Sequence, residues 1–426
     1  MVNEISTKEL EKVIDSKSYR ICDVRPVDAY NGWTLEGERR GGHIMGAKVM
    51  PAIWTYEENW DEMLRNKGIM PNHRIVVYGY TKDDAVEVAE KFLISGYRDV
   101  SVYTRFVDEW AANESLPMER MERFEKLVYP KWVHQLVSGK CPPDFNGNKY
   151  AICHCHYRNK ADYDIGHIPG AIALDTLMLE SPDTWNRRSP EELKQALMKL
   201  GISADTTVVV YGRFSYPSNT DPHPGSKAGH LGSIRCAALM MYAGVRDVRV
   251  LNGSIAAWGN EDYPFSTDEL KLEPLSEFGD RVPARPEIFI DTPQVKALLR
   301  SGNGNLISVR SWDEFIGKVS GYNYIFKKGC IPGAIFGNCG SDAYHMENYR
   351  NIDLTTREYH EIQSMWNKSG ITSDQFNVFY CGTGWRASEA FLNAYLMGWN
   401  KIAVYDGGWY EWSNDPNNPI TVGKSL

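Results

Sequence analysis

The chain has few cysteines, no long apolar run and no excess of positive charge. Its eight cysteines are spread over 426 residues, which is sparse for a secreted protein held together by disulfides. No uninterrupted apolar stretch approaches the ~20 residues that a membrane-spanning helix needs. Residues 1–16 contain neither a basic segment nor an apolar core, so they do not resemble a signal peptide. We therefore expect a cytoplasmic protein with reduced thiols and no membrane association.

The charge balance excludes two further classes of protein. Lys and Arg number 47 and Asp and Glu number 55, which gives a net charge of −8. A mildly acidic chain argues against a nucleic-acid partner, whose binding surface should be basic. Apolar residues make up 42% and charged residues 24%, which is typical of a folded globular protein and excludes a disordered one. At ~150 residues per domain, the length predicts about three domains.

One sequence pattern occurs three times along the chain. Each copy has a strand-like start, a turn that contains Gly-Ala, a short apolar strand that ends near a Tyr, and a helix that runs into a glycine. Strands that alternate with helices predict an α/β fold with a parallel sheet in each copy. The apolar strands lie at 75–80, 208–213 and 377–382, and the helices are expected at 83–95, 233–244 and 387–398.

The repeats predict three domains, at 1–125, 126–270 and 271–426. A charged connector precedes the second domain. The polar, proline-containing segment 268–287 reads as the linker into the third. The first two domains are expected to be inactive, because a glycine follows their central strand where the third domain has a cysteine.

That difference is the strongest chemical signal in the sequence. Copies one and two have Gly79 and Gly212 after the central strand, whereas copy three has Cys381. The Gly-x-Gly segment that follows lets backbone N–H groups turn inward as an anion-binding nest, and a helix begins directly after it. These features favour a thiolate or a persulfide on the cysteine. A small buried core cysteine is the alternative, but it needs no such loop. The expected anion-binding loop consists of Gly382, Thr383, Gly384, Trp385 and Arg386.

The spacing between Cys381 and Arg386 separates two chemistries. Cysteine phosphatases use Cys-x5-Arg, whose loop wraps three phosphate oxygens. This chain has Cys-x4-Arg, and the shorter loop suits a single additional sulfur. The spacing therefore favours sulfur transfer over phosphoryl transfer.

On these residues the chain resembles the tandem rhodanese-type sulfurtransferases, in particular bacterial proteins with three rhodanese domains. The specific match lies in copy three, in YCGTGWRASE at 380–389 and YDGGWYEWS at 405–413. The resemblance implies a five-stranded parallel sheet flanked by helices in each domain, and Cys381 as the sulfur-carrying residue. The family includes thiosulfate and 3-mercaptopyruvate sulfurtransferases. A related three-domain group resembles the anaerobic ergothioneine synthases, which move polysulfide sulfur onto the imidazole carbon of hercynine.

We therefore predict a rhodanese-type enzyme that moves sulfane sulfur from a donor to an acceptor through a persulfide on Cys381. The donor is thiosulfate, 3-mercaptopyruvate or a polysulfide. The acceptor is cyanide, a thiol, a partner protein or an imidazole carbon. Loop N–H groups would stabilise the persulfide anion, and neither a metal nor an organic cofactor is expected. The alternative from another class is a non-enzymatic relay that hands sulfur to a docked protein.

Further residues are candidates for substrate binding. Tyr322 and Asp342 lie in segments that only copy three contains. Arg310 follows the first strand of that copy, and it either binds a carboxylate or forms an internal ion pair. The insertion at 214–233 of copy two is expected to be irregular, and it either walls off the pocket or is a surface loop. The full set of candidates is Tyr322, Asp342, Arg310, Tyr380, His223 and His230.

The remaining cysteines have two interpretations each. Cys330 and Cys339 either resolve a persulfide as a disulfide or are small packing residues, and we favour packing. The run Cys153-His154-Cys155-His156 suggests zinc, but alternate residues of a strand face opposite sides. A structural zinc site usually needs a second pair of ligands, and no such pair is evident. The sequence therefore predicts no metal site.

Overall fold

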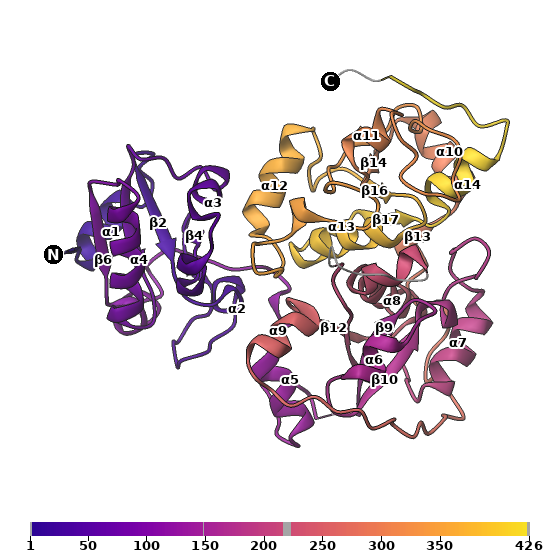
Figure 1. The fold of residues 1–426 in the computed structure, drawn as a ribbon, viewed down its shortest axis with the longest axis horizontal. Helices are drawn as coiled ribbons and strands as arrows, with labels where there is room; N and C mark the ends of the chain where they lie inside the picture. The colour runs from indigo at the N-terminus through magenta and orange to yellow at the C-terminus, as the bar shows by residue number, and fades with distance from the viewer. Residues whose placement is uncertain (1, 148, 216–222, 424–426) are drawn as a thin grey trace. The chain divides into compact units, whose positions relative to one another are not determined.

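The computed structural model describes residues 2–147, 149–215 and 223–423. The chain divides into two compact units, residues 1–125 and residues 126–426 (Figure 1). No helix in the described part of the chain combines the length and the apolar character that crossing a bilayer requires.

The first unit contains a five-stranded parallel sheet in the order β1-β6-β5-β2-β4. Its strands are β1 (Asn3–Glu4), β2 (Tyr19–Asp23), β4 (Lys48–Val49), β5 (Arg74–Tyr78) and β6 (Val100–Tyr103). Its helices are α1 (Thr7–Val13), α2 (Val27–Asn31), α3 (Trp60–Asn66) and α4 (Lys82–Ile94).

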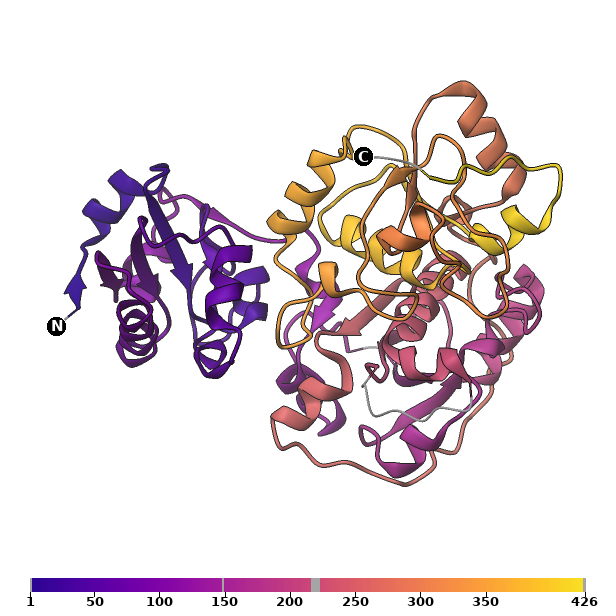
Figure 2. The ribbon, with the colours of Figure 1, turned by 45° about the horizontal axis from the view of Figure 1, so that its top comes forward.

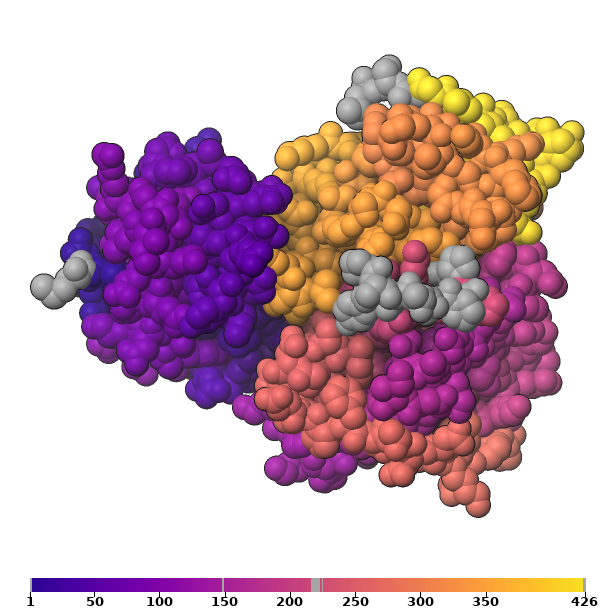
Figure 3. Space-filling model, in the orientation of Figure 1, coloured from indigo at the N-terminus to yellow at the C-terminus, as the bar shows by residue number. Residues whose placement is uncertain are grey.

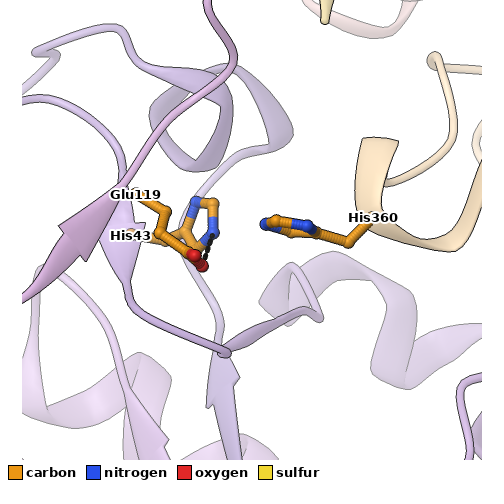
Figure 4. Close-up of side chains that lie close together, drawn as sticks. All are labelled: His43, Glu119 and His360. Carbon is orange, nitrogen blue, oxygen red and sulfur yellow. Dashed lines mark ion pairs between the residues drawn. The ribbon is translucent and has the colours of Figure 1, made fainter. Parts of the chain in front are cut away.

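A small antiparallel pair of strands closes the C-terminal part of this unit. Strand β3 (His43–Ile44) pairs with β7 (Met118–Glu119). The pairing brings the buried His43 ring to 3.7 Å from the Glu119 carboxylate (Figure 4). This contact ties the end of the first unit to its Gly-Ala turn.

The second unit contains two more sheets of the same kind. The second domain has the strand order β10-β9-β11-β12-β8, and all its pairs are parallel. Its strands are β8 (Leu127–Val128), β9 (Tyr150–His156), β10 (Ala171–Asp175), β11 (Thr207–Tyr211) and β12 (Asp247–Leu251). Its helices are α5 (Pro130–Val137), α6 (Ala161–Ile165), α7 (Pro190–Lys199), α8 (Gly229–Ala243) and α9 (Ser254–Asn260).

The third domain repeats the arrangement in the order β13-β17-β16-β14-β15. Its strands are β13 (Phe289–Ile290), β14 (Asn305–Ser308), β15 (Ile335–Phe336), β16 (Asn377–Tyr380) and β17 (Ile402–Tyr405). Its helices are α10 (Thr292–Ser301), α11 (Trp312–Phe315), α12 (Tyr359–Lys368), α13 (Trp385–Leu396) and α14 (Gly408–Asn414). Three parallel five-stranded sheets flanked by helices confirm the predicted fold.

Helices α8 and α13 pack against each other between the sheets of the second and third domains (Figures 1 and 2). Every residue of α8 is buried, as expected of a helix covered on all sides. In the space-filling view, the magenta-to-salmon second domain directly adjoins the orange third domain (Figure 3). The two domains therefore form one body, and the N-terminal ends of both helices lie in its interior.

The insertion of copy two is shorter than the sequence predicted. Helix α8 begins at Gly229, so the last five residues of the predicted irregular segment 214–233 are helical. Residues 224–228 form a 3-10 helix, and residues 216–222 lie outside the described part of the chain. Gly232, in the first turn of α8, disfavours a helix by propensity alone. Packing overrides that preference, because Gly232 lies directly against the ring of Trp385 in the third domain.

Candidate active site

Cys381 lies at the carboxyl end of the central strand β16, where ligands bind in parallel sheets. The residue is only 1% exposed. The backbone N–H of Gly384 donates to its Sγ atom at 3.2 Å. Gly384 has φ +96°, a left-handed conformation that favours glycine, and this conformation turns the N–H toward the sulfur.

Two backbone hydrogen bonds from the segment that follows β17 hold the loop in place. The N–H of Trp409 donates to the carbonyl of Cys381 at 2.8 Å, and the N–H of Tyr410 donates to the carbonyl of Gly382 at 3.0 Å. Helix α13 begins at Trp385, so its positive N-terminal end lies within the same loop. The loop can thus stabilise a negative sulfur without any side-chain charge.

The corresponding positions of the first two domains have no room for a nucleophile. A Cβ at Gly212 would lie 2.2 Å from the carbonyl oxygen of Gly229. A Cβ at Gly79 would lie 2.8 Å from the side chain of Val24. These distances are shorter than real carbon contacts, so a side chain at Gly212 would have to displace backbone, and one at Gly79 would have to displace the Val24 methyl.

The side chain of Arg386 does not present a free charge to Cys381, although the residue belongs to the expected anion-binding loop. Its guanidinium forms two bonds of 2.9 Å with the carboxylate of Glu314. It also donates to the Tyr322 hydroxyl at 2.7 Å and contacts Cys339 Sγ at 3.2 Å. Burial alone would raise the pKa of Glu314, but Arg386 and Arg310 lower it to about 2. The guanidinium is therefore a buried structural anchor beneath the loop.

Arg310 belongs to the same buried cluster and is not a substrate-binding residue. Its Nε lies 3.5 Å from Glu314, and both side chains are fully buried. The guanidinium donates to the backbone carbonyls of Glu314 and Gly329. Of the two interpretations that the sequence left open, the structure gives the internal ion pair. Sequence reasoning missed Glu314, and its only signal was the capping pair that it forms with Ser311.

A cavity of about 180 Å³ opens in front of the loop. Residues of both the second and the third domain surround it. The lining residues are Tyr157, Arg158, Trp185, His223, Gly225, Ala228, Leu231, Tyr322, Tyr324, Ala343, Tyr344, Thr383, Trp385 and Arg386.

Tyr322 covers the sulfur loop directly. A Cβ at Gly382 would lie 2.4 Å from the Tyr322 ring, so the ring rests on the backbone of the loop. The neighbouring Tyr324 bonds through its hydroxyl to the Thr383 side chain. Its ring centroid is 5.2 Å from that of Tyr322. The two tyrosines therefore lie against the sulfur loop and line the cavity beside it.

The second domain supplies the opposite wall of the cavity, which is one of the two interpretations that the sequence left open for the insertion 214–233, but the sequence singled out neither Trp185 nor Tyr157. Trp185 lies 4.6 Å from Tyr324, centroid to centroid, and Tyr157 makes an edge contact with Trp385 at 5.7 Å. No local motif marks Trp185 or Tyr157 as site residues, because they reach the cavity only through domain packing. The resulting wall of aromatic faces suits a cationic ligand.

The structure places three predicted contacts differently, and a fourth, His223, as predicted. The Tyr380 hydroxyl accepts from the N–H of Ile331 at 3.3 Å inside the core, away from the cavity. His230 stacks on Phe214, and burial holds its pKa well below the usual range. The Asp342 carboxylate accepts from its own turn, and only the two residues after it line the cavity. Of the two histidines proposed in the insertion, only His223 lines the cavity.

Of the other cysteines, all but the exposed Cys141 are buried. Burial raises the pKa of Cys339 to about 12, although Arg386 opposes the rise. A thiol that stays protonated is a poor nucleophile, which favours the packing interpretation. Cys330 lies in the main core of the third domain. Cys153 and Cys155 lie on one face of β9 beside Cys236, and His154 faces Tyr211 on the other side.

The model of the rhodanese-like domain matches this chain three times, at residues 6–113, 156–261 and 291–415. The chain therefore belongs to the rhodanese family, and it is a rhodanese-type sulfurtransferase, as the sequence predicted. It is 38% identical over 420 residues to the thiosulfate sulfurtransferase YnjE of Escherichia coli, covering 96% of this chain and 91% of that protein. It is 29% identical over 280 residues to the sulfur carrier protein TtuD of Thermus thermophilus, covering 62% of this chain and 87% of that protein.

The solved structures of EanB are similar to the whole chain. EanB in complex with ergothioneine is 53% identical, with a TM-score of 0.98 and 100% of both chains covered. A variant of EanB in complex with hercynine gives the same identity and TM-score and covers 100% of this chain and 99% of that one. A further structure contains a cysteine persulfide in a tetrahedral intermediate state with ergothioneine.

Proposed function

We propose that this sulfurtransferase carries sulfur as a persulfide on Cys381 and moves it from a polysulfide to the imidazole carbon of hercynine. The observation that supports the proposal is the aromatic cavity that opens in front of the sulfur loop. Hercynine carries a trimethylammonium group, and aromatic faces attract such cations. A cavity of about 180 Å³ suits a small amino-acid derivative better than a protein segment.

The variants made in EanB support the same assignment. They include a threonine two positions after the persulfide cysteine, a tyrosine 59 positions before it and cysteines 42 and 73 positions before it. The same separations from Cys381 lead in this chain to Thr383, Tyr322, Cys339 and Ser308. Three of these four residues have the same type, and Thr383 and Tyr322 line the cavity.

The first half-reaction loads the cysteine. The Cys381 thiolate attacks the outer sulfur of the polysulfide, the S–S bond beyond it breaks, and a shortened polysulfide leaves with the electron pair. The N–H of Gly384, already 3.2 Å from Sγ, stabilises the negative charge of the loaded cysteine.

The second half-reaction transfers the outer sulfur from Cys381 to hercynine. The imidazole carbon bonds to the outer sulfur, the S–S bond breaks, and its electron pair returns to Cys381 as thiolate. The carbon loses its proton to solvent, so one C–H bond is exchanged for one C–S bond. Carbon is oxidised and the sulfane sulfur is reduced, so the step needs no metal or organic cofactor, and we propose that none takes part.

Arg158 is the proposed partner of the hercynine carboxylate. The residue lines the cavity and is exposed, and its guanidinium lies over the ring of Tyr157 at 5.3 Å. The guanidinium also forms a hydrogen bond with the Tyr157 side chain, which helps to fix it, and its remaining N–H groups can bind a carboxylate. The acceptor would then be held at both ends, by aromatic faces at the ammonium group and by Arg158 at the carboxylate.

Thiosulfate is the second donor supported by a specific observation, the similarity to the thiosulfate sulfurtransferase of Escherichia coli. Transfer to a partner protein and a cytoplasmic location remain predictions from the sequence.

One experiment separates these functions. The purified protein is incubated with polysulfide and hercynine, and separately with thiosulfate and cyanide, and the products are identified by mass spectrometry. We expect ergothioneine in the first mixture, and intact protein heavier by one sulfur atom when hercynine is omitted. Thiocyanate without ergothioneine would overturn the hercynine proposal in favour of the thiosulfate reaction. A sulfur adduct without turnover of either acceptor would favour a relay.

A further inference from the structure

The second domain, which has Gly212 in place of a nucleophile, contacts the catalytic loop through Trp385. The Trp385 indole N–H donates to the two carboxylate oxygens of Glu180, at 3.0 and 3.2 Å. On the other side of the ring, a Cβ at Gly232 would lie 3.3 Å from two of its carbons. Tyr157 makes an edge contact with the same ring. Three groups of the second domain thus enclose one side chain of the loop.

Glu180 is itself fixed by a chain of buried charges. Arg235 of α8 donates to Glu180 at 2.7 Å and to Asp406 at 2.6 Å. All three side chains are at most 1% exposed. Asp406 also pairs with Arg187 at 2.8 Å. A carboxylate held in this way keeps a single orientation toward the indole.

Arg235, from the same group of buried charges, contacts two more parts of the site. Arg235 donates to the backbone carbonyl of Trp185, whose ring lines the cavity, at 3.1 Å. A Cβ at Gly384 would lie 2.9 Å from the Arg235 guanidinium, so this guanidinium rests on the residue whose N–H meets Cys381.

We propose that Glu180 is a positioning residue for acceptor binding, which acts by fixing the Trp385 indole in the wall of the cavity. The inference builds on the proposed function, because the acceptor in question is hercynine. Glu180 does not line the cavity, so it acts through Trp385 rather than on the acceptor itself.

The test uses Glu180→Met, which keeps the length of the side chain but cannot accept from the indole, and Glu180→Gln, which still can. With polysulfide in excess, we expect Glu180→Met to raise the KM for hercynine about tenfold, as loss of a buried hydrogen bond would. The kcat should change much less, and Glu180→Gln should stay within about twofold of the parent in KM. Glu191→Met, at an exposed position of the same domain, is the matched control.

A spectroscopic readout makes the test independent of the acceptor. The protein is labelled with 5-fluorotryptophan, and the Trp385 signal is assigned as the one that Trp385→Phe removes. This signal should move in Glu180→Met and stay in place in Glu180→Gln. If Glu180→Met does not fold, Gly232→Ala replaces it, because the added methyl displaces the ring from the opposite side and should also raise the KM.

Each result decides between the two claims. An unmoved Trp385 signal, or a parental KM in Glu180→Met, overturns the positioning role. Equal impairment in the Gln and Met variants also overturns it, because the carboxylate charge rather than the bond to the indole would then matter. A parent protein that forms no ergothioneine refutes the proposed function, and the fluorine signal still decides the orientation of Trp385.

Discussion

Replacing Glu314 by Gln should destabilise the second unit by an amount that can be worked out from the structure. The carboxylate is fully buried between Arg386 and Arg310. Its pKa falls from 4.5 to about 2 on folding. Each pH unit of such a fall contributes about 1.4 kcal/mol, so the ionised carboxylate contributes ~3 kcal/mol to the free energy of unfolding. Removing one partner of a buried ion pair costs ~3–5 kcal/mol, which agrees.

The same pKa values determine how the free energy of unfolding depends on pH. The pKa of Glu314 is lower in the folded state than in the unfolded state, so the stabilisation is complete above about pH 4.5. It is lost as the pH falls through the folded value near 2. The stability of the parent should therefore decline over this range, and the Gln variant should lack this part of the decline.

Urea unfolding at pH 7, followed by circular dichroism, measures the effect. A loss of ~3 kcal/mol should move the midpoint of the transition of residues 126–426 down by ~1 M, given slopes of ~3 kcal/mol/M. Glu191→Gln, at an exposed position, should stay within ~0.5 kcal/mol of the parent. A loss below ~1 kcal/mol in Glu314→Gln, with a normal slope, would refute the argument that Arg386 depends on this carboxylate.

Three further predictions concern the reaction itself. Cys381→Ser should gain no sulfur from polysulfide and form no ergothioneine, and an intact-mass adduct in this variant would contradict the assignment. Arg158→Gln should raise the KM for hercynine about tenfold, as loss of a charged hydrogen bond would. The KM for a hercynine analogue that lacks the carboxylate should change less than about twofold. Equal changes in the two KM values would refute the contact between Arg158 and the carboxylate. Gly384→Ala should slow persulfide loading about tenfold, because its φ of +96° disfavours alanine by ~1–2 kcal/mol and the methyl meets Arg235. Gly370→Ala, at a φ of +74° with no atom near the added carbon, is the control that should load normally.

The sequence by itself determined the elements of the fold and the position of the nucleophile. Short apolar strands alternating with helices appear three times, and this periodicity is a local property that can be read along the chain. The sulfur loop was equally readable, because Cys381, two glycines and the start of α13 are adjacent in sequence. The predicted bounds of these helices were off by one to four residues. The largest error was at α8, where burial against Trp385 rather than helix propensity decides that Gly232 is helical.

The partners of these residues were decided by the tertiary structure alone. The charge of Arg386 is balanced by Glu314, which lies 72 positions earlier, and no spacing rule connects the two. Tyr380 stands next to the nucleophile in sequence, but strand alternation turns its side chain into the core. Glu180 and Trp185 belong to a domain that the sequence marks as inactive, and they lie outside the insertion 214–233, the only part of that domain that the sequence connected with the pocket. They form part of the site because α8 and α13 pack together and bury that domain against the loop, and such long-range packing leaves no local pattern in the sequence.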